Sequence, residues 1–309
     1  MIRVVSSIRD TGTVDRPVVF AAGAFDGVHR GHQAVFRAAI DLAASCHGEA
    51  WALSFDPHPL KVLRPESAPP LITSTPHRLR LLAETGIRGV VLIPFNEAMA
   101  SLEPESFIFA VREQTPRLHA FVVGENWTFG RRASGDVALL RKLGARFGFD
   151  VVAVPRVQWN GAPISSTRIR QAVREGDLAA AEAMLGRPFS MFGTVIHGAK
   201  IGRQLGYPTA NVDPHNEVRP PPGVYACRTR VDGRVYPSAA FLAARPDPRK
   251  GPPDLVEVHL LDVSLDLYGR DIDVEFVKKL RDEWQFESVD VLKTQIARDC
   301  EEARAVLSA

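Results

Sequence analysis

Two histidines follow a glycine-rich turn near the start of the chain. Residues Gly23–His32 read GAFDGVHRGH and come directly after the apolar run Val18–Ala22, which predicts a buried strand, and a helix is expected over Gln33–Ala44. Such a turn directs backbone N–H groups and a helix N-terminus at one point, which suits a phosphate. His29 and His32 can add charge-assisted hydrogen bonds to phosphate oxygens. No Cys or carboxylate flanks the pair at metal-ligand spacing, which argues against zinc. The strand–HxGH–helix unit predicts a nucleotidyl-transfer site, and a plain solvated turn is the alternative.

Two further loops at predicted strand ends carry aromatic and charged side chains. Residues Ser54–Pro59 (SFDPHP) present an aromatic ring, a carboxylate and an imidazole on a segment stiffened by two prolines, although a rigid turn alone would also explain them. Residues Gly124–Arg132 (GENWTFGRR) contain Trp127 and Phe129, which could flank a planar ring, and two arginines that could hold phosphates. Trp127 could equally be a packing residue.

A run of three hydroxyl residues opens a predicted helical region at Ser165–Leu185, which is interrupted near Gly176. Residues 165–170 read SSTRIR. One hydroxyl would be enough to cap the helix. Three hydroxyls, the free N–H groups of the helix end and the guanidinium groups can together bind a triphosphate.

The elements that must position these residues alternate between strand and helix in the first half of the chain. The predicted strands are Val18–Ala22, Glu49–Phe55, Gly89–Pro94, Ala120–Gly124 and Asp150–Pro155. The predicted helices are Gln33–Ala44, Pro76–Glu84, Pro104–Gln114 and Gly135–Phe147. This alternation predicts an α/β fold with a parallel sheet and helices on both faces. Ligands of such sheets bind at the carboxyl ends of the strands, where the turn after Ala22 lies.

The second half has shorter apolar runs with frequent glycines and prolines between them, which predicts a small antiparallel barrel. The predicted strands are Gly193–His197, Gly223–Thr229, Arg234–Ala240, Leu255–Leu261 and Asp271–Phe276. A helix is expected over Ser288–Leu307. Its apolar positions recur at a spacing of three to four, and this face should pack on the barrel: Val289, Leu292, Ile296, Cys300 and Ala303.

One segment of the second half could bind nucleotide phosphates. Residues Gly193–Asn211 read GTVIHGAKIGRQLGYPTAN, in which glycines permit a close loop and Lys200 and Arg203 supply charge; the ending of a Walker A motif is absent. Thr209 and Asn211 face one side if the chain is extended there, and their oxygens can ligate Mg²⁺ beside phosphates. A polar strand edge is the alternative.

A carboxylate on a later strand could accept a proton. Glu257 and His259 alternate with apolar neighbours in Leu255–Leu261, so both face the same side. Glu257 could act as a general base towards a substrate hydroxyl, although a glutamate on a strand commonly just faces solvent.

Length and composition limit the class of protein. The chain has 309 residues, 45% hydrophobic and 24% charged residues and a net charge of +2. This length predicts two domains, which we place at residues 1–186 and 187–309 on either side of a Gly-Arg-Pro break. The small net charge gives no argument for nucleic-acid binding. No run of the sequence approaches the roughly 20 apolar residues of a membrane span. The three cysteines are widely spaced, which favours reduced thiols over disulfides. We expect a cytoplasmic monomer or weak homo-oligomer with neither nucleic-acid nor membrane partner.

The motifs together resemble a known family. GAFDGVHRGHQ, SFDPHP, FGRRASGD and SSTRIR look like the adenylyltransferase half of prokaryotic bifunctional riboflavin kinase/FMN adenylyltransferases (FAD synthetases). GRQLGYPTAN, PPPGVYA, VEVHLLD and DLYG resemble the riboflavin kinase module of the same family, and the resemblance covers almost the whole chain. It implies an N-terminal Rossmann-like nucleotidylyltransferase domain and a C-terminal riboflavin kinase-like barrel with a terminal helix. The implied reactions phosphorylate riboflavin to FMN with ATP, and then adenylylate FMN to FAD with release of pyrophosphate.

The resemblance also implies roles for individual residues. Catalysis would involve Glu257, as the base that activates the ribityl 5′-hydroxyl, with His29, His32 and Arg168. ATP would be bound by residues of both halves: Gly23, Phe25, Asp26, His29, His32, Ser165, Ser166, Thr167, Arg168, Gly198, Lys200, Arg203, Thr209 and Asn211. Mg²⁺ would accompany ATP at Thr209 and Asn211. The flavins, which are substrates and products, would be bound by Asp56, Pro57, His58, Asn126, Trp127, Phe129, Arg281 and Phe286.

The chain departs from the family pattern at three places. Ala24 replaces a usual Asn, Asn126-Trp127 replaces an Asp-Phe pair, and Phe241-Leu242-Ala243 replaces Asn-Ile-Gly. The leading hypothesis is the bifunctional enzyme. An adenylyltransferase with a weakened kinase barrel is the second, and a flavin-binding or regulatory protein without either activity is the third.

Overall fold

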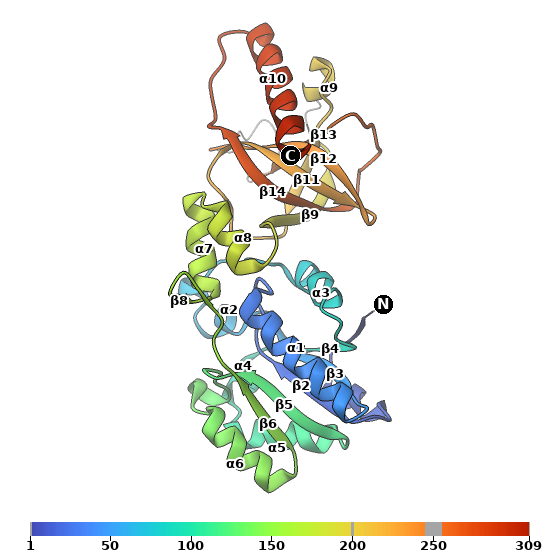
Figure 1. Ribbon diagram of the computed structural model, residues 1–309, viewed down its shortest axis with the longest axis vertical. Coiled ribbons are helices and arrows are strands. Elements are labelled where there is room, and N and C mark those ends of the chain that lie inside the picture. Colours follow the sequence, from blue (N-terminus) through green and yellow to red (C-terminus); the bar gives the residue numbers. More distant parts are fainter. Residues whose placement is uncertain (1, 199–200, 245–254, 309) are drawn as a thin grey trace. The chain divides into compact units, whose positions relative to one another are not determined.

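The computed structural model describes residues 2–198, 201–244 and 255–308 (Figure 1). They form two compact units, one of Met1–Pro69 with Thr75–Ser165 and one of Pro70–Ser74 with Ser166–Ala309. Helices α7 (Ser166–Glu175) and α8 (Leu178–Leu185) group with the second unit. The break between these two helices at Gly176 was predicted from the sequence and is confirmed. The domain boundary after residue 186 remains a prediction about which segment folds alone.

The first unit is built on a parallel sheet with the strand order β1-β4-β3-β2-β5-β6. The strands are β1 (Arg3–Val5), β2 (Val18–Ala22), β3 (Glu49–Asp56), β4 (Gly89–Pro94), β5 (Leu118–Gly124) and β6 (Asp150–Val154). Five of them were predicted to within two residues at either end. Strand β1 was missed because three residues are too few to show a period.

Helices cover both faces of this sheet, as predicted (Figure 1). Alternate residues of β2 face opposite sides: Phe20 packs in a cluster with α5 (Pro104–Gln114) and α6 (Val137–Phe147). Ala21 packs in a second cluster with α1 (Arg30–Ser45) and α3 (Thr75–Ala83). Every residue of β2 is buried, which explains its continuous apolar sequence. The smaller elements of this unit are η1 (Ile8–Thr13), α2 (Pro59–Leu63), η2 (Pro65–Ser67), α4 (Glu97–Ser101), η3 (Arg131–Ala133), β7 (Gln158–Trp159) and β8 (Ala162–Pro163).

The second unit contains a closed antiparallel barrel with the strand order β10-β13-β12-β11-β14-β9. The strands are β9 (Ser190–Ile196), β10 (Ala210–Pro214), β11 (Gly223–Val231), β12 (Arg234–Leu242), β13 (Val256–Leu260) and β14 (Asp271–Arg281). Along β13, Val256, Val258 and Leu260 are buried, whereas Glu257 and His259 lie on the other face of the strand and are half-buried. The predicted barrel is confirmed. Helix α9 (Ile201–Leu205) lies where a loop was expected.

The terminal helix α10 (Val289–Ser308) packs against β11, β12 and β14 (Figure 1). Cys300 and Ala303 cluster with Ala226 and Leu261, and three half-buried residues of the helix pack against this cluster: Ile296, Val306 and Leu307. The predicted apolar face is wrong at its first position, because the Val289 side chain is 62% exposed. The buried residues of α10 begin only at Asp299.

Residues Pro70–Ser74, here called the strap, belong to the second unit although they lie in the first third of the sequence. The Leu71 N–H donates to the Glu217 carboxylate at 2.9 Å, and the Glu217 N–H donates to the Leu71 carbonyl at 3.0 Å. Arg170 Nε donates to the Pro70 carbonyl at 2.7 Å, and the Ile72 side chain is 1% exposed. No local pattern predicts the strap, because its partners lie about 100 residues or more away in the chain. Within the described residues, no helix is long and apolar enough to cross a membrane.

Candidate active sites

The His29–His32 turn lies at the carboxyl end of β2 and begins helix α1. The His29 Nδ1 atom accepts a hydrogen bond from the His32 backbone N–H at 3.3 Å, so His29 caps the helix and the helix begins at Arg30 rather than at the predicted Gln33. The two imidazole rings stack with their centroids 3.6 Å apart. Phe25 and Val28 hold left-handed backbone angles, with φ of 55° and 43°. Such strain in non-glycine residues is frequent at functional sites.

Burial sets the protonation of His32. Desolvation lowers the pKa of His32 well below its ordinary value, and the positive charges of His29 and Arg78 lower it further. Its Nδ1 atom is buried and has no hydrogen-bond partner among the described residues. His32 is therefore neutral at pH 7 in this structure. A phosphate anion beside it would favour the protonated form and supply a partner.

Arg78 joins the two strand ends that carry the sequence motifs. The side chain leaves helix α3, is 3% exposed, and donates from Nη1 to the Ala24 carbonyl and from Nη2 to the Phe55 carbonyl, both at 2.8 Å. Burial lowers the pKa of Arg78, and the carboxylates of Asp26 and Asp56 oppose that shift. Sequence reasoning missed this residue. The spacing could have indicated it, because Arg78 lies three residues before Leu81 and so shares the buried face of the helix.

Of the predicted flavin residues, Asp56 ends strand β3, and Pro57 and His58 follow it directly. The Thr75 hydroxyl donates to Asp56 Oδ1 at 2.7 Å, and His58 Nδ1 accepts from the Leu60 N–H at 3.2 Å to cap α2. Asp56 and Pro57 are exposed. Asp56 is thus held in place by α3, the helix that also carries Arg78.

The two aromatic rings after β5 stack on each other. Trp127 and Phe129 have ring centroids 4.7 Å apart and planes 16° from parallel, and Phe129 is buried in the core. The expectation that a planar ligand ring lies between them is wrong in this structure, because the gap is already closed. Asn126 beside them is exposed. Arg131, one of the two arginines considered for phosphate, is paired with Glu103.

The other residues predicted to bind ATP in this half have varied surroundings. Phe25 and Asp26 are buried, and the Gly23 N–H donates to the Leu53 carbonyl at 3.1 Å. Ser165 ends the first unit, and the next three residues form the first turn of α7 in the second unit: Ser166, Thr167 and Arg168. Because the division falls between Ser165 and Ser166, the placement of this turn against His29 and His32 stays a prediction.

A cavity of about 290 Å³ lies in the second unit, outside the barrel wall. Three strands bring predicted residues together in one row: Asn211 of β10 is paired in register with Glu257 of β13, which is paired with Phe241 of β12. The row continues through Val224 to Arg281. All five line the cavity, together with Gly202, Leu205, Tyr207, Thr209, Ala239, Ala240, His259, Glu283, Trp284, Phe286, Leu292, Ile296, Asp299 and Cys300.

The backbone approaches Thr209 and Asn211 closely. A Cβ on Gly198 would lie 2.3 Å from Asn211 Nδ2, and one on Gly202 would lie 3.0 Å from the Thr209 hydroxyl. Larger residues would therefore displace both side chains. Arg203 lies on a smaller cavity of about 70 Å³ that also borders Thr209. Lys200 lies outside the described residues.

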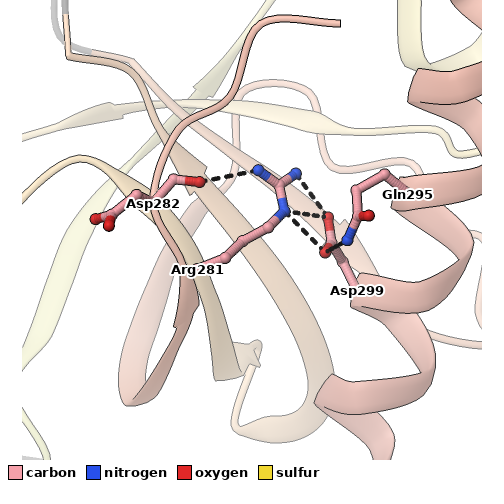
Figure 2. Close-up of polar contacts among 4 residues, drawn as sticks. All are labelled: Arg281, Asp282, Gln295 and Asp299. Atoms are coloured by element: carbon pink, nitrogen blue, oxygen red, sulfur yellow. Dashed lines mark hydrogen bonds and ion pairs between the residues drawn. The ribbon is translucent and has the colours of Figure 1, made fainter.

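Arg281 is engaged within the chain rather than left for a ligand. It pairs with Asp299 of α10 (Figure 2). Its Cζ atom lies 4.9 Å from the ring centroid of Trp284 and 5.5 Å from that of Phe286. Sequence reasoning missed Asp299, although a carboxylate three residues after Ile296 on the predicted apolar face was a usable signal. Burial raises the pKa of the Cys300 thiol to about 11, so this cavity residue is protonated.

Comparison with known proteins separates the two halves in the same way. Residues 12–168 match the family model for FAD synthetase, and residues 185–307 match the model for riboflavin kinase. The bifunctional riboflavin kinase/FMN adenylyltransferase of Escherichia coli strain K12 is 40% identical over 91% of this chain and 90% of its own length. The chain belongs to this bifunctional family. The Haemophilus influenzae family member of the same name is 35% identical over 98% of each chain.

A solved structure shares the fold along nearly the whole chain. A solved structure from Streptococcus pneumoniae, described as a macrolide-efflux protein, superposes with a TM-score of 0.82 at 31% identity over 97% of this chain and 98% of that one. The efflux description belongs to that protein. The family resemblance read from the motifs is thereby confirmed, and so are the parallel α/β sheet and the antiparallel barrel with its terminal helix.

Proposed function

We propose that this FAD synthetase family member phosphorylates riboflavin to FMN at the barrel cavity and adenylylates FMN to FAD at the His29–His32 turn. The observation that carries the proposal is the strand register that aligns Asn211 with Glu257 in one cavity bordered by Thr209. A hydroxyl, an amide and a carboxylate beside an apolar wall are what a flavin kinase needs: oxygen ligands for a metal–nucleotide, a base, and a surface for a planar ring.

In the kinase reaction, the ribityl 5′-hydroxyl oxygen attacks the γ-phosphorus of ATP. The new P–O bond forms as the bond to the β-phosphate oxygen breaks, and ADP leaves. Glu257 accepts the hydroxyl proton, a role that typically contributes about 10²–10⁴ in rate. Phe286, Trp284 and the α10 residues Leu292 and Ile296 supply the apolar side of the cavity for the ring.

Thr209 and Asn211 fit a magnesium ion bound together with ATP. Their hydroxyl and amide oxygens are hard ligands, and Gly198 and Gly202 let the backbone lie close against these two side chains. Among the described residues no group of three or more His, Cys, Asp or Glu side chains could hold a metal alone, so nucleotide oxygens would complete the coordination. Bound Mg²⁺ would neutralise charge on the transferred phosphoryl group.

In the adenylyl-transfer reaction, a phosphate oxygen of FMN attacks the α-phosphorus of ATP and pyrophosphate leaves. No covalent enzyme intermediate is needed, so positioning and charge stabilisation account for catalysis. His29, His32 and the N-terminal turn of α7 with Arg168 would bind the phosphates. Asp56, Pro57, His58, Asn126 and Trp127 would lie on the FMN side.

One observation favours a second candidate, an adenylyltransferase with a weak kinase. Phe241 is the register partner of Glu257 on β12 and lines the same cavity. Its ring occupies space beside the proposed base. We expect Phe241→Asn to raise the rate of riboflavin phosphorylation if this ring is an obstacle, and to lower it if the ring is part of the flavin site.

The working form of the protein is also part of the proposal. The chain would act in the cytoplasm as a monomer or weak homo-oligomer, with riboflavin, FMN and ATP as its partners and no nucleic acid or membrane. Residues 187–309 would fold as a separate kinase domain. Size-exclusion chromatography with light scattering tests the first statement, and circular dichroism of that fragment tests the second.

The direct test is incubation of the full chain with riboflavin, ATP and Mg²⁺, followed by chromatography of the flavins. The proposal expects FMN and then FAD. FAD formed from added FMN but not from riboflavin would leave the second candidate. No product from either flavin would refute both candidates and favour a flavin-binding protein.

A further inference from the structure

The Arg281–Asp299 ion pair joins the end of β14 to α10 beside the cavity (Figure 2). Arg281 Nε lies 2.9 Å from Asp299 Oδ1 and 3.1 Å from Oδ2, and Nη2 lies 2.8 Å from Oδ2. Nη1 donates to the Asp282 carbonyl at 2.9 Å, and Gln295 Nε2 donates to Asp299 Oδ1 at 2.8 Å. The two side chains are only 12% and 7% exposed. Both charges are thus satisfied from within the chain.

This pairing argues against a direct role of Arg281 in holding the substrates. A guanidinium in a bidentate pair has its charge neutralised and its fork occupied, so it is a poor phosphate ligand. Riboflavin itself carries no phosphate and its ring is neutral at pH 7. The guanidinium instead lies against the rings of Trp284 and Phe286, which line the cavity.

The first half of α10 has no fully buried residue, and Ile296 packs only half-buried against the Ala226–Leu261 cluster. The buried residues of the helix are Asp299, Cys300 and Ala303, so none of the residues from Val289 to Arg298 is buried. Leu292 and Ile296 in that half nevertheless line the cavity. Asp299 is therefore the first fully buried residue of the helix, and Arg281 is its ion-pair partner.

We propose that the Arg281–Asp299 ion pair is a positioning element for the flavin ring, which sets the apolar cavity wall formed by Trp284, Phe286, Leu292 and Ile296. This inference rests on the proposed kinase function. The pair acts through the wall and does not touch the phosphates. Its loss should weaken riboflavin binding and leave ATP binding and FMN adenylylation unchanged.

The test compares three variants of the full chain: Arg281→Met, Asp299→Leu and both together. In each single variant we expect the KM for riboflavin to rise about 10- to 100-fold, with a smaller change in kcat, because small displacements of a positioning group cost this much. Each single variant should also melt at a lower temperature, because one buried charge is left alone. The double variant should regain the melting temperature while its KM stays raised.

A matched control lies on the same helix. Arg304 pairs with Asp262, but these side chains are 44% and 65% exposed and lie outside the cavity lining. Arg304→Met should change neither the KM for riboflavin nor, to a measurable extent, the melting temperature. Recovery of the KM together with the melting temperature in the double variant would overturn the proposal, since the pair would then only stabilise the fold.

Failure of the kinase assignment is distinguishable from failure of this inference. If the wild-type chain forms no FMN, the proposed kinase function is refuted, and the pair is judged by riboflavin affinity from quenching of flavin fluorescence. Phe286→Ala identifies the part of that signal that belongs to the cavity. The positioning role is overturned if Arg281→Met leaves the affinity for riboflavin unchanged. It is also overturned if Phe286→Ala removes none of the fluorescence quenching, because riboflavin then does not bind in the cavity.

Discussion

The two candidate sites each contain a nearly buried arginine, but the arginines are held by different kinds of partner. Arg78 donates to the carbonyls of Ala24 and Phe55, which are fixed at the ends of two neighbouring strands. Arg281 pairs with the side chain of Asp299, the first fully buried residue of helix α10. The first site is therefore held by the sheet itself, whereas the shape of the second depends on one ion pair between two elements.

The difference matters because the two proposed reactions make different demands. Adenylyl transfer needs several phosphate ligands in fixed positions, which a strand-to-helix turn supplies from its backbone. The kinase site must also admit a large planar ring, and a wall formed by a helix and a loop can be shaped for it. Mutations in the first site should thus affect the chemical step, and those in the wall of the second should affect flavin binding.

The largest expected effect is the separation of the two activities by single substitutions. Glu257→Gln keeps the size of the side chain but cannot accept a proton, so riboflavin phosphorylation should fall by about 10²–10⁴. His32→Ala removes a phosphate ligand in the other unit and should abolish FAD formation. Each variant should leave the other activity nearly intact when rates are measured separately with riboflavin and with FMN. Equal loss of both activities in a folded variant would contradict two independent sites.

The second prediction concerns the way in which Arg78 is held. Arg78→Met leaves two strand-end carbonyls and the nearby Asp26 and Asp56 without their cation, which should cost about 3–5 kcal/mol of stability. FAD formation should fall steeply, while FMN formation at the barrel is unchanged. Chemical denaturation and separate rate measurements check both statements. Arg78→Lys should be intermediate, since it keeps the charge and loses the planar fork.

The control for Arg78 is Arg80 on the same helix. Its ion pair with Glu84 is partly exposed, so Arg80→Met should cost less than 1 kcal/mol. A similar loss of stability and activity in both variants would mean that α3 is merely sensitive to substitution.

The sequence predicts the helices and strands of this molecule better than it predicts the partners of its buried charges. Strands β2–β6, β9 and β11–β14 and the helices α1, α5 and α10 were predictable from their apolar patterns. Thr209 with Asn211, and Glu257 with His259, were each expected to share a side, and all four line one cavity. The partners of buried charges were not predictable. Asp299 is 18 residues from Arg281, and the carbonyls that bind Arg78 carry no sequence signal at all, because every residue has one.

The strap shows the same limit for domain boundaries. Ile72 is a typical core residue in any sequence analysis, and nothing local indicates that it is buried in the second unit. Long-range contacts of this kind are set by the folded surface of the partner. The stacking of the Trp127 ring on the Phe129 ring was not predictable either. The same sequence could hold the two rings against each other or apart with a ligand between them.

The third prediction uses the strap to separate the two units. Ile72→Ala should destabilise the chain by about 2–5 kcal/mol, the usual cost of truncating a buried isoleucine. The loss of hydrogen-exchange protection should appear first in strands β9 and β14 of the second unit rather than in the sheet of the first. Ile87→Ala, a core residue of the first unit, should give the opposite pattern. Loss of protection confined to β2–β5 in the Ile72→Ala chain would refute the assignment of the strap.

The smallest expected effect is a pH dependence that only the first site should show. Because the pKa of His32 is lowered in the folded chain, the unfolded chain binds more protons at pH values between the folded and the unfolded pKa. The contribution of His32 to the free energy of unfolding should therefore be constant above about pH 6.5. Below that pH it should destabilise the folded chain, and the free energy of unfolding should fall by up to about 1.4 kcal/mol per pH unit. Urea denaturation at a series of pH values measures this loss of stability. The His32→Gln variant should not show the loss, whereas the His119→Gln variant, with its substitution on β5, should still show it.

Pyrophosphate should reduce the slope in the wild-type chain, because an anion beside His32 stabilises the imidazolium. If pyrophosphate leaves the slope unchanged while His32→Gln removes it, His32 is a buried structural residue and the phosphate must bind elsewhere.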